Sequence, residues 1–195
     1  MIIEGLVTTV NASGTVNLAP LGVVVASNEA VRPSSILLRP YPGSKTYSNL
    51  KDVPQGVFHC TDNVLLMAEA LLDEARPDWT ESETVAVPRL ADAPSWWEFQ
   101  IEQWDESSLP SRARAEVLHV GHTRAMVGLC RAKWAVIEAA ILVSRIGILP
   151  DDQIHEGLAR LPVIVDKTGS DSEKQALRRL MDHAEQRTGS AERSP

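Results

Sequence analysis

Short runs of β-branched and apolar residues, each closed by turn residues, fill about the first 120 positions of the chain. Such runs predict strands, and the Gly, Pro, Asn and Asp residues between them predict turns. Short helices are expected at 45–51 and, after Asp62 as N-cap, at 63–74. Short strands separated by turns favour a small barrel or sandwich. The expected strands cover 2–10, 16–26 with a bend at Pro20, 35–39, 56–60, 84–87, 97–102 and 115–120.

The composition changes after residue 122. Helices are expected at 130–146, 150–161 and 170–187, the last one opened by a capping box from Ser170 to Glu173. We therefore predict a mixed α+β chain that is mainly β. Its expected parts are a barrel over 1–122, a helical C-terminal region over 123–187 and a disordered tail over 188–195.

Charge and composition argue against several classes of partner and location. The net charge of -7 disfavours binding to nucleic acid or to an anionic membrane surface. No apolar run approaches the ~20 residues of a membrane span, and the N-terminus lacks the basic region of a signal peptide. Cys60 and Cys130 form no CxxC pair, which indicates reduced thiols and a cytoplasmic location.

The segment from Arg39 to Asn49 is the best candidate for chemistry. A predicted strand ends in a cation, a Pro/Gly turn follows, and Ser44, Lys45 and Thr46 begin a short helix. Unpaired N–H groups and the helix dipole make such a helix start suitable for a phosphate. The same residues also suit a capped helix with solvated Arg39 and Lys45, and local pattern alone does not separate the two interpretations.

Five motifs in order resemble the domain-of-unknown-function 447 family, which belongs to the FMN-binding split-barrel superfamily. The resemblance covers about residues 1 to 185. The motifs are residues 1–25, LLRPYPGSKTYSNL at 37–50, Trp96-Trp97-Glu98, RAKWAVIEAAILVSRIGIL at 131–149, and Lys167-Thr168-Gly169.

The resemblance implies a split β-barrel followed by helices, with FMN bound at the interface of a homodimer. It implies a redox enzyme acting on a small substrate, for which a pterin is one candidate, or alternatively a non-catalytic flavin-binding or sensor module. The phosphate-side pattern of the superfamily matches Arg39, Ser44, Thr46, Asn49 and Leu50, and Lys45 lies among them. The segment Asn17-Leu18-Ala19-Pro20 matches the bend where the backbone passes the flavin ring.

Further residues allow two interpretations each. Arg131, Glu138 and Arg145 lie seven apart on one helix stripe, so Glu138 is either a buried acid facing flavin or partner, or part of an ion-pair ladder. Lys133 is expected to be solvated. Cys130 is either a reactive thiol beside Arg131 or a small buried hydrophobe.

Aromatic and histidine residues complete the candidates. Alternation places Trp97 inward, and Trp96, on the other face, is the better interface candidate. Lys167-Thr168-Gly169 either receives an anion before the next helix or simply connects two helices. His59, His119 and His122 lack the further ligands of a recognisable metal site, so none is expected.

Overall fold

The computed structural model describes residues 1–188, and they form two compact units. Unit 1 consists of Met1–Thr61 and Arg76–Met126, and unit 2 combines Asp62–Ala75 with the chain from Val127 onward. One of the two helices expected within the β-rich region therefore groups with the C-terminal helices.

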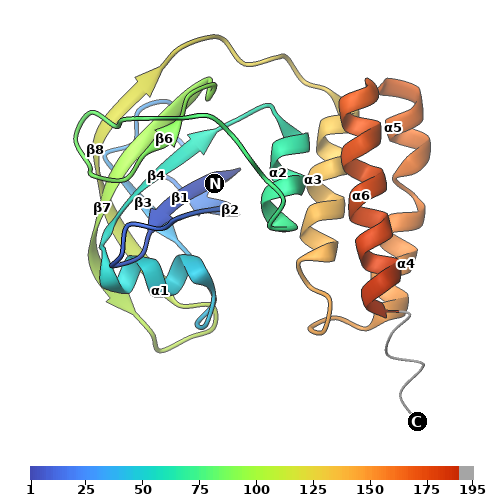
Figure 1. The fold of residues 1–195 in the computed structure, drawn as a ribbon, viewed down its shortest axis with the longest axis horizontal. Coiled ribbons are helices and arrows are strands. Elements are labelled where there is room, and N and C mark those ends of the chain that lie inside the picture. The colour runs from blue at the N-terminus through green and yellow to red at the C-terminus, as the bar shows by residue number, and fades with distance from the viewer. Residues whose placement is uncertain (189–195) are drawn as a thin grey trace. The chain divides into compact units, whose positions relative to one another are not determined.

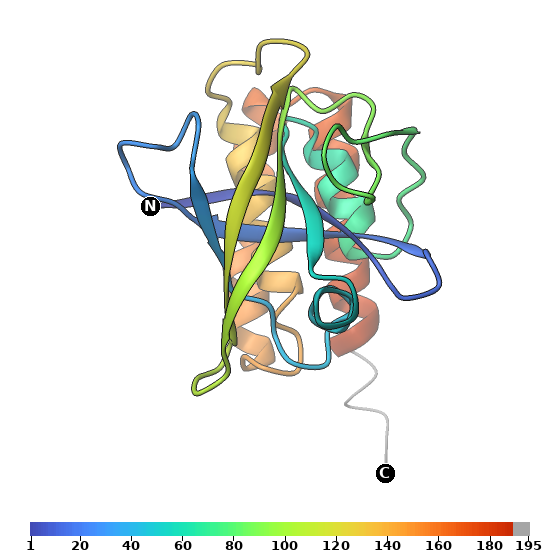
Figure 2. The same cartoon turned by 90° about the vertical axis from the view of Figure 1, so that its left-hand side faces the viewer.

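Six antiparallel strands close the barrel of unit 1 in the order β1-β2-β3-β8-β7-β4 (Figure 1). Figure 2 looks onto β7 and β8, with the β1–β2 hairpin running across behind them. The strands are β1 (Ile2–Val10), β2 (Val16–Val24), β3 (Ser35–Leu38), β4 (Gln55–Cys60), β7 (Ser95–Asp105) and β8 (Arg112–His122).

The β1–β2 hairpin stays in register along its whole length. Thr9 pairs with Asn17 and Leu6 with Pro20, so β2 continues through the proline that was expected to bend it. The Asn11 side chain accepts hydrogen bonds from the N–H groups of Ser13 and Thr15 and thereby fixes the tight turn.

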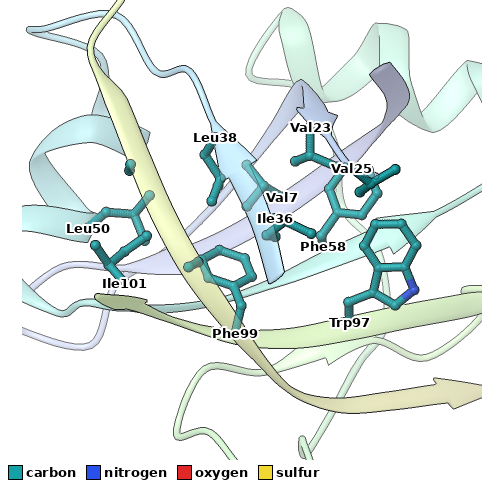
Figure 3. Packing of buried hydrophobic residues seen from close by; sticks show 12 residues of the cluster. Val7, Val23, Val25, Ile36, Leu38, Leu50, Phe58, Trp97, Phe99 and Ile101 are labelled. Atoms are coloured by element: carbon teal, nitrogen blue, oxygen red, sulfur yellow. The ribbon is translucent and has the colours of Figure 1, made fainter. Parts of the chain in front are cut away.

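The barrel interior holds the main hydrophobic core (Figure 3). Inward residues alternate along each strand, as the predicted period of two requires. Trp97 and Phe99 are buried there, as predicted for the inward face of their strand, and Leu50 enters from a helix. The buried members are Val7, Val23, Val25, Ile36, Leu38, Leu50, Phe58, Trp97, Phe99, Ile101, Ala113 and Ala115.

A second, smaller cluster covers the outer face of the barrel wall. Residues 79–90, which we call the strap, begin and end in the short strands β5 (Trp79–Thr80) and β6 (Arg89–Leu90). Trp96 is only 4% exposed in this cluster, so its prediction as an interface residue is wrong. The prediction of a strand at 84–87 is also wrong, because this part of the strap forms no ladder.

Two buried side chains hold the strap. The carboxylate of Glu98 accepts hydrogen bonds from the N–H groups of Glu83, Thr84 and Val85. His59 Nε2 accepts the N–H of Leu90 at 3.1 Å, while Nδ1 lies 3.2 Å from the carbonyl oxygen of Leu6. Burial lowers the pKa of His59 to about 3, which keeps the ring neutral in this structural role.

The described part of unit 2 consists of five helices: α2 (Val64–Leu71), α3 (Arg131–Val143), α4 (Asp151–Ala159), α5 (Pro162–Thr168) and α6 (Asp171–Thr188). The predicted N-cap Asp62 is wrong, because Asn63 caps α2 and the Asp62 carboxylate accepts the N–H of Val127 instead. Sequence reasoning missed α5.

Thr188, placed in the predicted disordered tail, is buried at the end of α6, and the rest of that prediction falls on 189–195, outside the described residues. Within residues 1–188, no helix combines the length and apolar character needed to cross a membrane.

Candidate functional site

The turn between β3 and α1 (Lys45–Asp52) builds the candidate site in unit 1. Gly43 has φ +86, a left-handed conformation that glycine adopts without strain. The N–H of Ser44 then donates to the carbonyl of Tyr41 at 3.1 Å. The Ser44 side chain accepts the N–H of Tyr47 at 3.2 Å, so Ser44 is the N-cap of α1 as predicted.

The charges at the N-terminal end of α1 suit an anion. Its first turn contains no Asp or Glu, whereas α4 and α6 begin with acidic residues. Arg39 and Lys45 are exposed on either side of the turn, and Arg39 has no hydrogen bond or ion pair with the described residues. Helix dipole and side-chain charge therefore favour an anion at this point.

The inner face of α1 is fixed to the barrel by polar contacts. Thr46 and Asn49 are buried. The Asn17 amide donates to the Thr46 hydroxyl at 3.3 Å, and the Asn49 amide donates to Thr9 at 3.1 Å. Three predicted site residues from two elements, Asn17, Thr46 and Asn49, thus meet under α1 and determine where its N-terminus points.

The opposite face of α1 is held by a contact that sequence reasoning missed. The Tyr47 hydroxyl donates to Glu106, and Lys51 forms an ion pair with the same carboxylate at 2.9 Å. The Lys51 ammonium also lies 4.4 Å from the ring centre of Trp104. Because Glu106 and Trp104 hold Lys51, the charge of Lys51 is engaged away from the helix start.

The predicted ring-side residues lie on both faces of β2. Asn17 and Ala19 are on the face that turns toward the barrel interior, where Ala19 packs against the core. Pro20 alternates with them and lies on the outer face, half-buried. The structure therefore groups Asn17 with the helix-start residues, while Ala19 and Pro20 remain separate predictions for a ring contact.

In unit 2, the charged residues of α3 and Arg145, just beyond its C-terminal end, differ from their predicted states. Arg131, Glu138 and Arg145 are exposed, and within residues 1–188 no ion pair joins them. The ion-pair ladder is therefore wrong, and Glu138 is not buried within the single chain, whereas its contact with flavin or a partner stays a prediction. Lys133, expected in solvent, donates to the Asp62 carbonyl at 2.7 Å and to buried Glu173 at 2.9 Å.

The remaining candidates, Cys130 and Lys167-Thr168-Gly169, lie where helices begin and end. Cys130 is half-buried at the start of α3, with its sulfur 3.7 Å from the Thr168 carbonyl. Gly169 is the C-cap of α5, and Glu173 fills the start of α6 by accepting the N–H and hydroxyl of Ser170. The connector interpretation of Lys167-Thr168-Gly169 therefore agrees with the structure. Among residues 1–188, no cluster of three His, Cys, Asp or Glu side chains is arranged to hold a metal ion.

Comparison with protein families and solved structures adds independent findings. Models of the N-terminal and C-terminal domains of a protein of unknown function (DUF447) match residues 3–124 and 130–182. No curated protein matches the chain. An FMN-bound protein of Methanosarcina mazei, assigned to DUF447, superposes with a TM-score of 0.80 at 20% identity, over 93% of this chain and 94% of that one.

Two enzymes share part of the fold. The 2-nitrobenzoate 2-nitroreductase of Pseudomonas fluorescens superposes with a TM-score of 0.52 at 23% identity, over 62% of this chain and 64% of its own. The flavin reductase component of a bacterial two-component tryptophan halogenase superposes with a TM-score of 0.52 at 15% identity, over 64% of this chain and 82% of its own. At these identities the likeness shows the fold alone. The superposition on the FMN-bound protein, over 93% of this chain, confirms the predicted split barrel followed by helices.

Proposed function

We propose that this chain, which belongs to the DUF447 family of proteins of unknown function, binds FMN through the N-terminal end of α1. One observation carries the proposal: the chain shares its fold, over 93% of its length, with an FMN-bound protein assigned to this family. The acid-free helix start with Arg39, Ser44 and Lys45 supplies the matching chemistry in this chain.

The helix start fits a phosphate monoester in charge and in donors. An FMN phosphate carries nearly two negative charges, which Arg39 and Lys45 balance. The Ser44 oxygen accepts the Tyr47 N–H, so the Ser44 hydroxyl proton remains available to a phosphate oxygen. Thr46 and Asn49 contribute by positioning α1, because their polar groups bind Asn17 and Thr9.

The flavin ring, in this proposal, lies along β2 and is covered by a second copy of the chain. Asn17 links β2 to the phosphate helix, which connects the two ends of the proposed site. The outer face of β2 presents the half-buried residues Leu18, Pro20 and Val24, next to exposed Ile2 of β1. An apolar outer face at this position is suited to a two-fold partner.

Redox catalysis on a small substrate is the activity we propose for this site. Bound FMN supplies hydride or electron transfer, so the protein needs only to bind and orient the cofactor and to admit the substrate. The chemistry therefore requires no nucleophile or acid–base pair from the chain. A related possibility, a flavin carrier or sensor, would use the same phosphate site without turnover.

Titration with FMN and with riboflavin, which lacks the phosphate, tests the anchor. Replacing Arg39 with Ala should remove about 1.5–3 kcal/mol of FMN binding, roughly 10- to 100-fold in affinity, and leave riboflavin binding unchanged. Ser44→Ala should act in the same direction, and Arg32→Ala, an exposed cation on the other side of β3, is the matched control. FMN affinity unchanged by Arg39→Ala would show that the anchor lies elsewhere.

Turnover is tested on the reduced flavoprotein. After photoreduction of bound FMN, nicotinamides, quinones and pterins are added separately without oxygen. Rapid reoxidation by one class supports a redox enzyme and identifies its substrate class, whereas reoxidation by none supports a carrier or sensor.

A further inference from the structure

Helix α3, together with Arg145 just beyond its C-terminal end, presents a line of large and mostly exposed side chains. Arg131, Glu138 and Arg145 are exposed, and Trp134 between the first two is 57% exposed. Half-buried Ile141 continues the same line. The opposite face of α3 packs inside unit 2 through Ala132, Ala135, Val136, Ala139, Ala140 and Val143.

Within residues 1–188, the charges on this line form no ion pair, although unit 2 pairs other charges. Arg179 forms ion pairs with Glu69 and Glu74, and Lys133 forms one with Glu173. By contrast, the described chain offers no ion pair to Arg131, Glu138 or Arg145. An exposed tryptophan flanked by unpaired charges of both signs is typical of a contact surface, since tryptophan and arginine are enriched at the centres of interfaces.

The order of the charges restricts what can cover this line. Two such helices in parallel would set Arg131 against Arg131 and Glu138 against Glu138. An antiparallel pair centred on Glu138 would likewise oppose like charges. An antiparallel pair centred on Trp134 instead sets Arg131 of each copy opposite Glu138 of the other and stacks the two exposed rings at the axis.

We infer that the α3 line Arg131, Trp134 and Glu138 binds the same line of a second copy of the chain, antiparallel about a two-fold axis at Trp134. The pairing buries the largest exposed ring of unit 2 and neutralises two charges in each copy. A pair centred on Ile141 would also match charges, Glu138 with Arg145, but would leave Trp134 outside the contact centre. The inference does not rest on the proposed phosphate anchor, whose residues all lie in unit 1.

Cysteine pairing measures this contact directly. In a Cys130→Ser background, one preparation carries Arg131→Cys and another carries Glu138→Cys, and the two are mixed and oxidised. The proposed register places the new thiols opposite each other across subunits, while the remaining Arg131–Glu138 contact is intact. In each variant alone, the thiols are about seven residues or ~10 Å apart along the helix, too far for a disulfide.

The expected result is a mixed disulfide that forms at least about tenfold faster than any disulfide in either variant alone, and that is lost with Trp134→Ala. Mixing Arg131→Cys with Arg145→Cys is the matched control and should give no such product. Arg131→Glu should weaken the association about tenfold, and Arg131→Glu combined with Glu138→Arg should restore it.

A Glu138→Cys plus Arg145→Cys product in place of the expected one would overturn the register. Absence of any mixed disulfide would overturn the inference. Since FMN titration is measured on the same variants, failure of this contact is distinguished from failure of the proposed cofactor site.

Discussion

Replacing Glu98 with Gln should lower the free energy of unfolding by about 2–6 kcal/mol. One carboxylate oxygen accepts the Glu83 N–H at 2.8 Å and the Trp96 ring N–H at 3.1 Å. The other accepts the N–H and hydroxyl of Thr84 at 2.6 and 2.7 Å and the Val85 N–H at 3.3 Å. An amide keeps only one oxygen, so at least two donors, one of them buried and the rest part-buried, lose their acceptor, at about 1–3 kcal/mol each.

The loss should depend on pH in a defined direction. Burial raises the pKa of Glu98, but the hydrogen bonds from Glu83, Thr84 and Trp96 lower it by more, so it lies below 4.5 in the folded state. Because the pKa of Glu98 is lower in the folded state, ionised Glu98 stabilises the fold when the pH is above its pKa in the unfolded state. This stabilisation is lost as the pH falls through the pKa of the folded state. The difference between wild type and Glu98→Gln should therefore be largest near pH 7 and shrink below about pH 4.5.

Urea unfolding followed by circular dichroism at pH 7 and pH 4 measures this difference. Glu102→Gln, an exposed change on the same strand, is the control and should shift stability by less than about 0.5 kcal/mol. A Glu98→Gln loss no larger than that of the control would refute the role assigned to the carboxylate.

Two further changes probe packing and the buried ion pair. A Cβ at Gly121 would lie 2.1 Å from the Trp96 ring, so Gly121→Ala should cost about 1–3 kcal/mol in thermal unfolding, while Gly128→Ala, with open space around it, should have little effect. Lys133→Met leaves buried Glu173 without its cation and should cost about 1–3 kcal/mol at pH 7. Burial raises the pKa of Glu173, but the hydrogen bonds from Ser170 and Lys133 lower it by more, to about 2. The loss of unfolding free energy in Lys133→Met should therefore decline from pH 4.5 toward pH 2. A loss that does not change with pH would contradict this prediction.

Local chemistry was sufficient to predict the elements that carry the candidate site. The Asn11 turn, the strands on either side of it, and α1 with Ser44 as N-cap follow from residues within a few positions of each other. Each is determined by turn or capping preferences, which act over short distances. The cations and hydroxyls of the helix start could therefore be found without the fold.

Contacts between distant segments could not be predicted. The alternation correctly separated Trp97 from Trp96, but Trp96 is buried because the strap, held by Glu98, lies over it. The Trp96-Trp97-Glu98 motif thus has a structural role. Lys133 was misjudged for the same reason, since its partner Glu173 is 40 residues away.

The supports of α1 illustrate the same limit at the candidate site. Asn49 binds Thr9 at a separation of 40 residues, and Tyr47 binds Glu106 at 59. No local pattern marks these pairs, because only closure of the barrel brings them together. The sequence thus predicts which groups could receive a phosphate, whereas the fold determines how they are oriented.

A crystal structure of the protein grown with FMN tests the central proposal most directly. The account predicts that the phosphate lies within hydrogen-bond distance of the Ser44 hydroxyl at the start of α1, with the Arg39 and Lys45 side chains directed toward it. Density for the phosphate at any other part of the chain, with the α1 start facing solvent, would contradict the account.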